Sequence, residues 1–497
     1  MKNEIRNLVI GTGPSGFAAI NALIEKGAKP TVIDIGITQD FEEAGYIGNQ
    51  ESKHELKSNS GKLFMYYYPN ESINFDELTH AVALSGALGG LSNVWAGGWQ
   101  LPQRETIGDL PEKTFKEIEF AAKNLISKFE HTGIQDGLSH LASLNFLGGI
   151  KIETSKRVQR MHRRFLSLKS LNRFEVSFGQ PRLLLKVKEA GKVATKTLDS
   201  TQQGSQEFIF NSGEIIAELI RDGKVDYIKG RVTKVFKAED KIKLNVMLTS
   251  GESQIFSANK VFLGAGSVGT PLILQNSFKE LNEIRIRDSQ MFQVAYLSYR
   301  RNNWKNQLYS FPQGYFQSSS QNIEFSCSVL ENSRQLEERV YSGTKVLRLK
   351  KARILSRLLS PYLMAGIGFI SMEKSGEIIL NSQNGASKVT TSQNNAAKST
   401  IKKSVRRLRR MCLSLGVVVI GYRINKPKVG AGFHSGSAFP MCQVSRDQYS
   451  TNLLGEVSFC ANLHIIDSSS LPRIITGSHT FTAMANADRI AREVGDF

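Results

Sequence analysis

LVIGTGPSG, at residues 8–16, is an apolar run that leads directly into a glycine-rich turn. In a turn of this kind Gly11 permits the sharp change of direction, and Gly13 lets the backbone approach a pyrophosphate. Gly16 lets the following helix pack closely on the strand. The N-terminus of that helix favours negative charge. The stretch therefore predicts a strand, a tight turn and a helix arranged to receive a phosphate group.

The segments that follow complete a βαβ unit. Residues 17–26 are predicted to form a helix, and residues 30–34 a second strand that ends at Asp34. An acid at this position can accept hydrogen bonds from ribose hydroxyls and argues against a 2′-phosphate. Together these features predict a dinucleotide site, in which Pro14 and Ser15 of the turn also contact the cofactor. The alternative is a glycine-rich turn without a ligand.

The length and composition are those of a globular protein with two domains. The chain has 497 residues, of which 40% are hydrophobic and 22% are charged, so we expect a large core. Its 4 cysteines form no short-spaced metal pattern, which suits a reducing compartment. Residues 1–7 are too polar for a signal peptide, and no apolar run approaches the roughly 20 residues of a membrane-spanning helix. These features favour a cytoplasmic location.

The net charge of +19 is concentrated in residues 151–164, 345–357 and 402–410. A basic surface can meet nucleic acid, an anionic membrane, an anionic substrate or only solvent. Residues 345–359 mix basic and apolar side chains as helices on anionic membranes do. Peripheral contact with the inner face of a membrane is therefore one hypothesis. We expect no nucleic-acid partner, because the basic clusters lack base-stacking aromatics and no recognition module is present.

A second group of strands is predicted in the middle of the chain. Residues 225–235 are predicted to form a strand, and residues 243–249 and 252–256 a hairpin around Ser250 and Gly251. A buried strand over residues 260–263 then runs into small residues and an apolar helix.

The remaining segments predict an α+β region built on an antiparallel sheet. Residues 111–132 have helical periodicity. Residues 381–398 are predicted to form a loop, and residues 400–415 an amphipathic helix that Ser399 or Thr400 can cap and Gly416 can end. Alternating residues predict strands in four segments, 292–299, 323–330, 365–371 and 377–380.

Parts of the chain resemble the GMC (glucose-methanol-choline) family of FAD-dependent oxidoreductases, particularly its bacterial, pyranose-oxidase-like branch. The glycine turn is one of them. Residues 85–99, SGALGGLSNVWAGGW, resemble the loop that lies along the flavin in this family. The order of segments in residues 225–274 resembles the second half of the FAD domain. Residues 430–492 resemble the C-terminal signature, in which His434 and His479 occupy separate turns rich in glycine and serine.

The resemblance implies an α/β fold with a discontinuous Rossmann-type FAD-binding domain. Residues 1–110, 205–279 and 430–497 would form that domain. Residues 111–204 and 280–429 would form an inserted α+β substrate domain, whose antiparallel sheet lines a substrate cavity.

The resemblance also implies which residues contact FAD beyond the glycine turn. Some family members bond the flavin covalently through a histidine just before the tryptophan of the loop. Val94 occupies that position here, so we expect non-covalent FAD. Without the resemblance, residues 85–99 could instead form a packed loop that binds no ligand, and Val232 could be an ordinary core valine. The implied contacts are Gly90, Ser92, Asn93, Trp95, Val232 through its backbone, Ala265, Gly266, Asp467 and Thr480.

The two histidines carry the implied chemistry. In the family the first histidine of the signature is the base that faces the substrate, and the second position is histidine or asparagine. His434 matches the first and His479 the second. The resemblance thus implies oxidation of a CH–OH group to a carbonyl, with the hydroxyl proton taken by His434 and a hydride passed to flavin N5. The substrate would be a small-molecule alcohol, with a sugar or lipid-linked sugar as a suggestion.

Two alternatives keep the fold and change the function. One is a flavin-dependent isomerase or reductase acting on a keto substrate. The other is a membrane-associated FAD-fold module without turnover. Nothing in the sequence identifies the electron acceptor.

Overall fold

The computed structural model describes residues 4–38, 73–75, 84–142, 144–147, 149–168, 173–187, 197–199, 208–301, 312–318, 324–331, 358–383, 386–420, 429–444 and 447–497. The basic segment 345–357 lies outside the described residues, so the hypothesis of membrane contact there stays a hypothesis. No helix in the described ranges combines the length and the apolar character that crossing a membrane requires.

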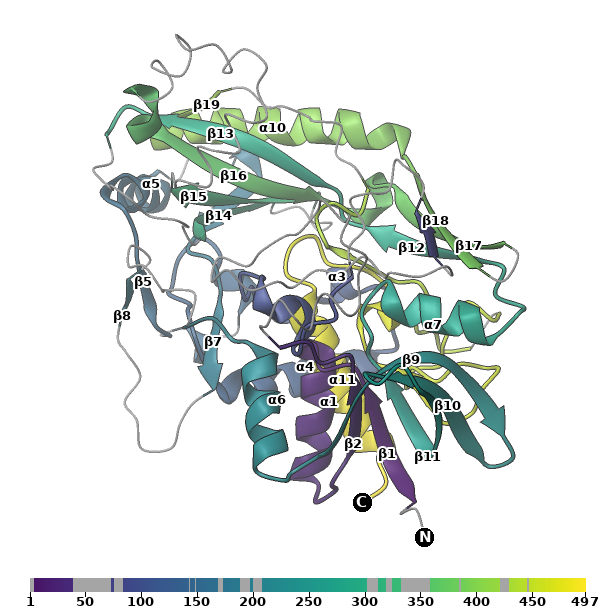
Figure 1. Ribbon diagram of the computed structural model, residues 1–497. Helices are drawn as coiled ribbons and strands as arrows, with labels where there is room; N and C mark the ends of the chain where they lie inside the picture. Colours follow the sequence, from purple (N-terminus) through teal and green to yellow (C-terminus); the bar gives the residue numbers. More distant parts are fainter. Residues whose placement is uncertain are drawn as a thin grey trace.

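A mixed sheet of six strands forms the first layer of the fold (Figure 1). Four of its strands are parallel and lie in the order β2 (Thr31–Asp34), β1 (Ile5–Ile10), β11 (Ser253–Leu263) and β21 (Leu463–Ile465). The ends of β1 and β11 are apolar and buried, as parallel strands covered on both faces require. The predicted Rossmann-type unit is confirmed.

β11 pairs with its neighbours in two orientations along its length. Its first half pairs antiparallel with β10 (Lys241–Leu248), and its second half pairs parallel with β1. β9 (Asp226–Ala238) pairs with both β10 and β2. The predicted hairpin is confirmed, with Gly251 at φ +84° in the turn. The two strands predicted over residues 252–263 are one continuous strand.

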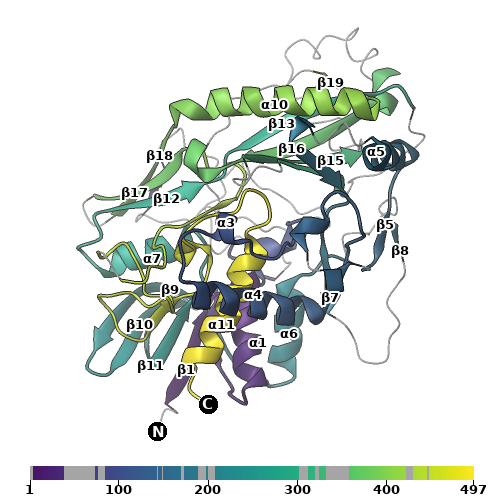
Figure 2. The ribbon, with the colours of Figure 1, turned by 180° about the vertical axis from the view of Figure 1, so that it is seen from behind.

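Three helices pack together on this sheet. α1 (Pro14–Glu25), α11 (Thr480–Val494) and α4 (Glu112–Ser127) share one apolar core with strand residues such as Val9 and Val32. α1 and α11 lie side by side, and Figure 2 shows α4 next to α11 from behind. α6 (Ser212–Arg221) packs near α1, and α7 (Gly269–Ser277) against β9.

An antiparallel sheet of six strands forms the second layer, at the top of Figure 1. α10 (Asn395–Leu415) and α5 (Lys156–Ser167) bury their apolar sides against its outer face. The other face points toward the first layer (Figures 1 and 2). Its strands are, in order, β19 (Val417–Ile420), β13 (Met291–Ser298), β16 (Leu363–Ile370), β15 (Phe325–Glu331), β14 (Pro312–Ser318) and β6 (Val176–Gly179).

A sheet of five strands joins the two layers at one side. It contains β20 (Ser435–Gly436), β12 (Glu283–Asp288), β17 (Glu377–Gln383), β18 (Ala386–Ser392) and β3 (Ile73–Phe75). Smaller elements are α3 (Arg104–Ile107), β4 (Phe129–His131), β5 (Lys151–Glu153), β7 (Leu184–Val187) and β8 (Thr197–Asp199). The four strands predicted from alternation correspond to β13, β15, β16 and β17.

The predicted loop over residues 381–398 is wrong. β17 continues into it, β18 pairs antiparallel with β17, and α10 begins at Asn395. The Asn394 side chain caps α10 by accepting the Ala396 N–H at 2.8 Å, so the helix begins five residues before the predicted start at residue 400. The small polar residues of β18 hid the alternating pattern of a strand, in which the side chain of Val389 is buried. The end of α10 is as predicted, with Gly416 at φ +84°.

The helix predicted over residues 111–132 is wrong at its C-terminal end. α4 stops at Ser127, and β4 then pairs with β7. Phe129 fits helical spacing, but its side chain is buried in the core from a strand. Tertiary pairing therefore overrides the local pattern.

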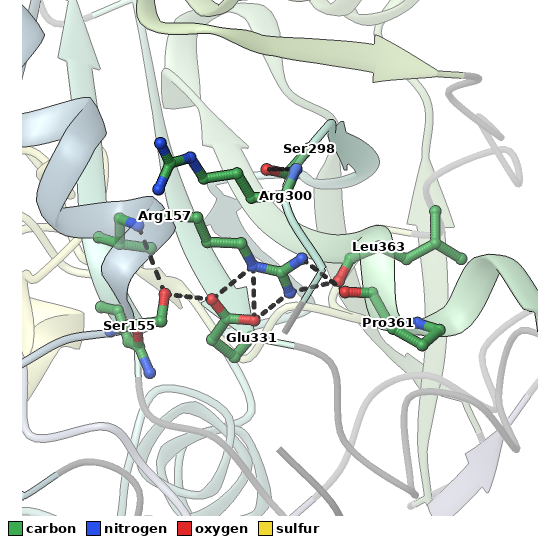
Figure 3. Close-up of polar contacts among 9 residues, drawn as sticks. Ser155, Arg157, Ser298, Arg300, Glu331, Pro361 and Leu363 are labelled. Carbon is green, nitrogen blue, oxygen red and sulfur yellow. Dashed lines mark hydrogen bonds and ion pairs between the residues drawn. The ribbon is translucent and has the colours of Figure 1, made fainter. Parts of the chain in front are cut away.

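A buried ion pair fastens α5 to the antiparallel sheet (Figure 3). Arg157 Nε donates to both carboxylate oxygens of Glu331, at 2.8 and 3.0 Å. The guanidinium also donates to the carbonyl oxygens of Pro361 at 3.0 Å and Leu363 at 2.8 Å, and Ser155 Oγ donates to Glu331. The two side chains are 3% and 0% exposed. One basic residue of the segment 151–164 is therefore structural.

Arg157→Ala is expected to lower the free energy of unfolding by about 3–5 kcal/mol, because Glu331 would remain charged and buried without its partner. Lys403→Ala is the control. It removes a pair with Glu324 whose side chains are 66% and 36% exposed, and should cost less than about 1 kcal/mol. Urea denaturation followed by tryptophan fluorescence compares the two variants. Equal small losses would contradict the structural role of Arg157.

Candidate active site

The loops after four parallel strands meet at one edge of the first sheet. Gly11 follows β1, Asp34 ends β2, Gly264 follows β11, and Ile466 follows β21. Gly264 N donates to the carbonyl of Ile10 at 2.9 Å, and Ile466 N to that of Leu263 at 3.0 Å. Ligands of open α/β sheets bind at the carboxyl ends of the strands. Sequence segments hundreds of residues apart therefore share one candidate site.

The glycine turn has two crowded positions and one open position. Gly11 has φ +94°, and a Cβ there would overlap the Gly264 carbonyl oxygen. A Cβ on Gly16 would overlap the carbonyl oxygen of Gly11. Gly13 has an ordinary φ of −59°, and apart from its neighbours in the chain no described residue comes within 4 Å of the place its Cβ would occupy. The turn thus leaves free space at the N-terminus of α1, where an anionic group is favoured.

Asp34 holds the glycine turn from the side. Its Oδ2 accepts hydrogen bonds from Thr12 N at 2.8 Å and Thr12 Oγ1 at 2.9 Å, and its Oδ1 accepts from Gly36 N at 2.6 Å. Burial raises the pKa of Asp34 to about 6, against these hydrogen bonds, which act to lower it. Both oxygens already have partners within the chain. The contact of Asp34 with ribose stays a prediction.

The glycine- and tryptophan-rich loop lies directly on this turn. Gly89 N donates to Thr12 Oγ1 at 2.9 Å. Gly90 begins a short 3₁₀ helix, and a Cβ on Gly90 would lie 3.5 Å from Gly13 Cα. The open space at Gly13 is therefore bordered by Gly90.

Three side chains predicted to contact FAD hold the shape of this loop. Ser92 Oγ donates to the Gly89 carbonyl at 2.6 Å, and Asn93 Nδ2 donates to the Gly90 carbonyl at 2.8 Å. Trp95 Nε1 donates to the carbonyl of Phe210 at 2.7 Å. These polar groups therefore already have hydrogen-bond partners within the protein. Any contact of the three residues with FAD would therefore involve their backbone or the face of the indole ring.

Two residues that the sequence did not single out join the loops. Ser212 Oγ donates to the Thr12 carbonyl at 2.9 Å, and Ser212 N donates to Ser92 Oγ at 3.1 Å. Asn211 Nδ2 donates to Asn93 Oδ1 at 3.0 Å, and its own Oδ1 caps α6. The cap has a recognisable sequence signal, because asparagine is a preferred N-cap residue. No local sequence pattern predicts the contact between Ser212 and Thr12.

Asp467 fastens the C-terminal segment to the turn after β11. Its Oδ2 accepts from Gly266 N at 2.9 Å and from Thr270 Oγ1 at 2.5 Å, and its Oδ1 accepts from Ser469 N at 2.8 Å. Burial raises the pKa of Asp467, while these hydrogen bonds act to lower it. Ala265 N donates to Thr270 Oγ1 at 3.1 Å. This network places the backbone of residues 265–266 at the sheet edge.

Val232 lies apart from this network. It is a buried residue of β9 that packs in an apolar cluster with residues such as Val246. Its predicted backbone contact with adenine stays a prediction.

The two histidines come together although 45 positions separate them. Their rings meet edge to face, with centroids 5.0 Å apart at 78°. Phe369 of β16 stacks on His434 at 3.9 Å with an interplanar angle of 2°. The Nδ1 atoms of His434 and His479 are buried and have no hydrogen-bond partner among the described residues. A substrate group could supply that missing partner.

Contacts on both sides connect the histidine pair to the loops of the candidate site. A Cβ on Gly98 would overlap Ser478 Oγ, so residues 85–99 touch the residue before His479. Ser267 Oγ and Ser435 Oγ lie 2.8 Å apart, so the turn after β11 touches the residue after His434. Thr480 begins α11 immediately after His479.

The loop that carries His434 is held in an unusual conformation. Phe433 and Ser437 have φ values of +56° and +53°, which non-glycine residues adopt only where the surroundings enforce them. Ser289 N donates to the His434 carbonyl at 2.8 Å, and Gly430 N to Asp288 Oδ2 at 2.9 Å. Burial raises the pKa of Asp288 to about 7. This strain at the candidate base is typical of a functional site.

Both imidazoles favour the neutral form. Burial, with a smaller contribution from His479, holds the pKa of His434 well below its ordinary value. Burial lowers the pKa of His479 to about 4, against the Gly477 carbonyl, which acts to raise it. Near pH 7 both rings are therefore neutral and able to accept a proton. The pair can act as a base and a hydrogen-bonding partner for one polar substrate group.

The fold and these converging loops define an α/β protein with a Rossmann-type layer and a buried histidine pair at its carboxyl edge. No family model matches the sequence, and no curated protein does. Among solved structures, the crystal structure of pyridoxine 4-oxidase from Mesorbium loti is similar, with a TM-score of 0.57 over 99% of each chain and 11% sequence identity. The predicted fold class is confirmed, and the chain shares the overall fold of that structure.

Proposed function

We propose that this protein is an FAD-dependent oxidoreductase of the GMC type that oxidises a CH–OH group to a carbonyl, with His434 as the base. One observation carries the proposal. Two buried, neutral imidazoles with unpartnered Nδ1 atoms lie against the loops that border the open space at Gly13. The similarity to an oxidase across nearly the whole chain supports the same reading.

The residues around the glycine turn suit a non-covalent FAD. The free N-terminus of α1 at Gly13 suits a pyrophosphate, and Gly90 leaves room beside it. The backbone of Ala265 and Gly266 lies at the same edge of the sheet, and Thr480 begins α11 directly after His479. Val94 offers no nucleophile for a covalent bond. The chemistry that FAD supplies when bound is acceptance of a hydride.

The protein's own part in the reaction is to orient the alcohol and remove its proton. Phe369 fixes the plane of the His434 ring by stacking on it. A neutral His434 can take the hydroxyl proton, and a base of this kind is worth about 10²–10⁴-fold in rate. His479, at the N-terminus of α11, can hold the substrate oxygen while charge develops on it.

The test begins with the colour of the purified protein. We expect a yellow protein that releases free FAD on denaturation by acid or heat, and whose flavin is bleached anaerobically by an alcohol. A colourless protein that cannot be reconstituted with FAD would refute the proposal. Flavin that stays attached after denaturation would contradict the non-covalent site. Oxidation of the reduced protein by a keto compound, without bleaching by alcohols, would indicate a reductase.

The pH dependence of flavin reduction should show a neutral base. Because a lowered histidine pKa keeps the ring neutral at lower pH, the rate constant should be level above pH 6.5, the ordinary histidine value. It should fall only at more acidic pH, as His434 becomes protonated. Anaerobic stopped-flow reduction at saturating alcohol measures the profile. A rate that keeps rising between about pH 7 and pH 9 would show that the base is another group.

A further inference from the structure

A row of side chains crosses the inner face of the antiparallel sheet and ends at the histidine pair. Gln317 of β14 is paired with Ser326 of β15, and Ser326 is paired with Phe369 of β16. Phe369 in turn stacks on His434. The neighbouring Phe316 and Cys327 lie in the core beneath α10. Since side chains alternate along a strand, the row points the other way, toward the histidines.

Both polar members of this row are buried, and the amide of Gln317 has no partner among the described residues. Gln317 and Ser326 are both 0% exposed. Neither amide atom of Gln317 makes a hydrogen bond with a described residue. The Ser326 side chain lies beside the Tyr315 hydroxyl and interacts with it. Native proteins leave few such groups unsatisfied, and each one needs an explanation. An amide can donate and accept at once, so a hydroxyl-bearing ligand would satisfy both of its ends.

The row also reaches the second histidine. A Cβ on Gly477, two positions before His479, would overlap the Tyr315 hydroxyl and would lie 3.4 Å from Ser326 Oγ. Ser326 therefore lies between the two histidine-bearing segments. Gln317 is two strands away from Phe369, which corresponds to roughly 10 Å. A substrate that contacts both Gln317 and His434 must therefore extend several bonds beyond the carbinol that reacts.

We propose that Gln317 and Ser326 form a hydrogen-bonding subsite for hydroxyl groups of the substrate remote from the carbinol that is oxidised. The substrate is then a polyhydroxylated molecule of roughly the size of a six-membered ring, and not a simple alkanol. This inference rests on the proposed function, because the subsite would bind the end of the substrate that is remote from the carbinol oxidised at His434.

Matched ring alcohols test the subsite. The probes are myo-inositol and D-glucose, which carry several hydroxyls, and cyclohexanol, which carries one on a ring of similar size. With the FAD-loaded full chain, we expect the polyols to reduce the flavin more efficiently than cyclohexanol. Gln317→Leu, which keeps the size of the side chain, should lower the efficiency with polyols about 10–100-fold, the value of one or two lost hydrogen bonds. The loss should appear mainly in KM, and cyclohexanol should be unaffected.

The controls separate a subsite from a structural role. Ser326→Ala should act in the same direction as Gln317→Leu. Gln313→Leu alters another fully buried glutamine of β14, whose Oε1 accepts from Ser155 N at 2.9 Å. That variant should change stability without changing the preference between polyol and cyclohexanol.

The experiment distinguishes failure of the proposed subsite from failure of the proposed function. If alcohols reduce the flavin but Gln317→Leu leaves the polyol preference unchanged, the subsite is refuted and the function stands. If no alcohol reduces the flavin, the function fails, and the subsite is tested by thermal-shift titration with myo-inositol. A shift lost in Gln317→Leu supports the subsite. The same shift in both proteins, or none in either, overturns it in favour of a buried structural water.

Discussion

His434→Ala is expected to slow flavin reduction by alcohol about 10²–10⁴-fold while FAD remains bound, because a general base contributes about that much. The imidazole meets His479 edge to face and lies flat on Phe369. Nothing in its described contacts involves the glycine turn, so cofactor binding should survive. The measurement is the limiting rate of anaerobic bleaching, with the ratio of flavin to protein absorbance as the check on FAD.

Three further variants sharpen this result. His140→Ala replaces an exposed histidine and should leave the rate unchanged. His479→Asn should retain more activity than His479→Ala, because an amide can still hydrogen-bond the substrate oxygen. A loss of less than tenfold in His434→Ala, with FAD bound, would show that the base lies elsewhere. Loss of the flavin from His434→Ala would instead assign the ring to cofactor binding.

Gly13→Val is expected to give a folded, colourless protein. Apart from its neighbours in the chain, no described residue comes within 4 Å of the Cβ position, and the φ of −59° suits any residue. The valine should therefore fit without strain, but it would fill the space where a pyrophosphate must approach the backbone. The measurements are the flavin absorbance after reconstitution and the melting temperature of the apoprotein.

Gly11→Ala provides the contrast. Its φ of +94° is strained for alanine, and the new methyl group would overlap the Gly264 carbonyl. This variant should lower the melting temperature of the apoprotein as well as FAD binding. A yellow Gly13→Val protein with the flavin content of the unsubstituted chain would refute a pyrophosphate site at this turn.

Much of the first layer could be predicted because its signals are local. The glycine turn, the helix that follows and the strand ending at Asp34 are adjacent in sequence, and each depends on its own backbone requirements. Three strands of the second layer, β13, β15 and β16, could also be predicted from the alternation of their residues. Prediction failed where composition and pairing disagreed, as in β18, whose small polar residues concealed a strand. Arg157 belonged to a basic run, and only the fold shows that Glu331 neutralises it.

The sequence by itself determined a Rossmann-type turn with an open glycine, a C-terminal helix preceded by His479, and an antiparallel region, because these depend on residues close in the chain. Only the tertiary structure decided that Gln317 and Ser326 lie in one row that ends at His434. That row depends on the register of β14, β15 and β16, which pair across long intervals of sequence. A shift of register by one residue would turn these side chains to the other face of the sheet. His434 could therefore be singled out from the sequence as a candidate base, and the row of Gln317 and Ser326 required the fold.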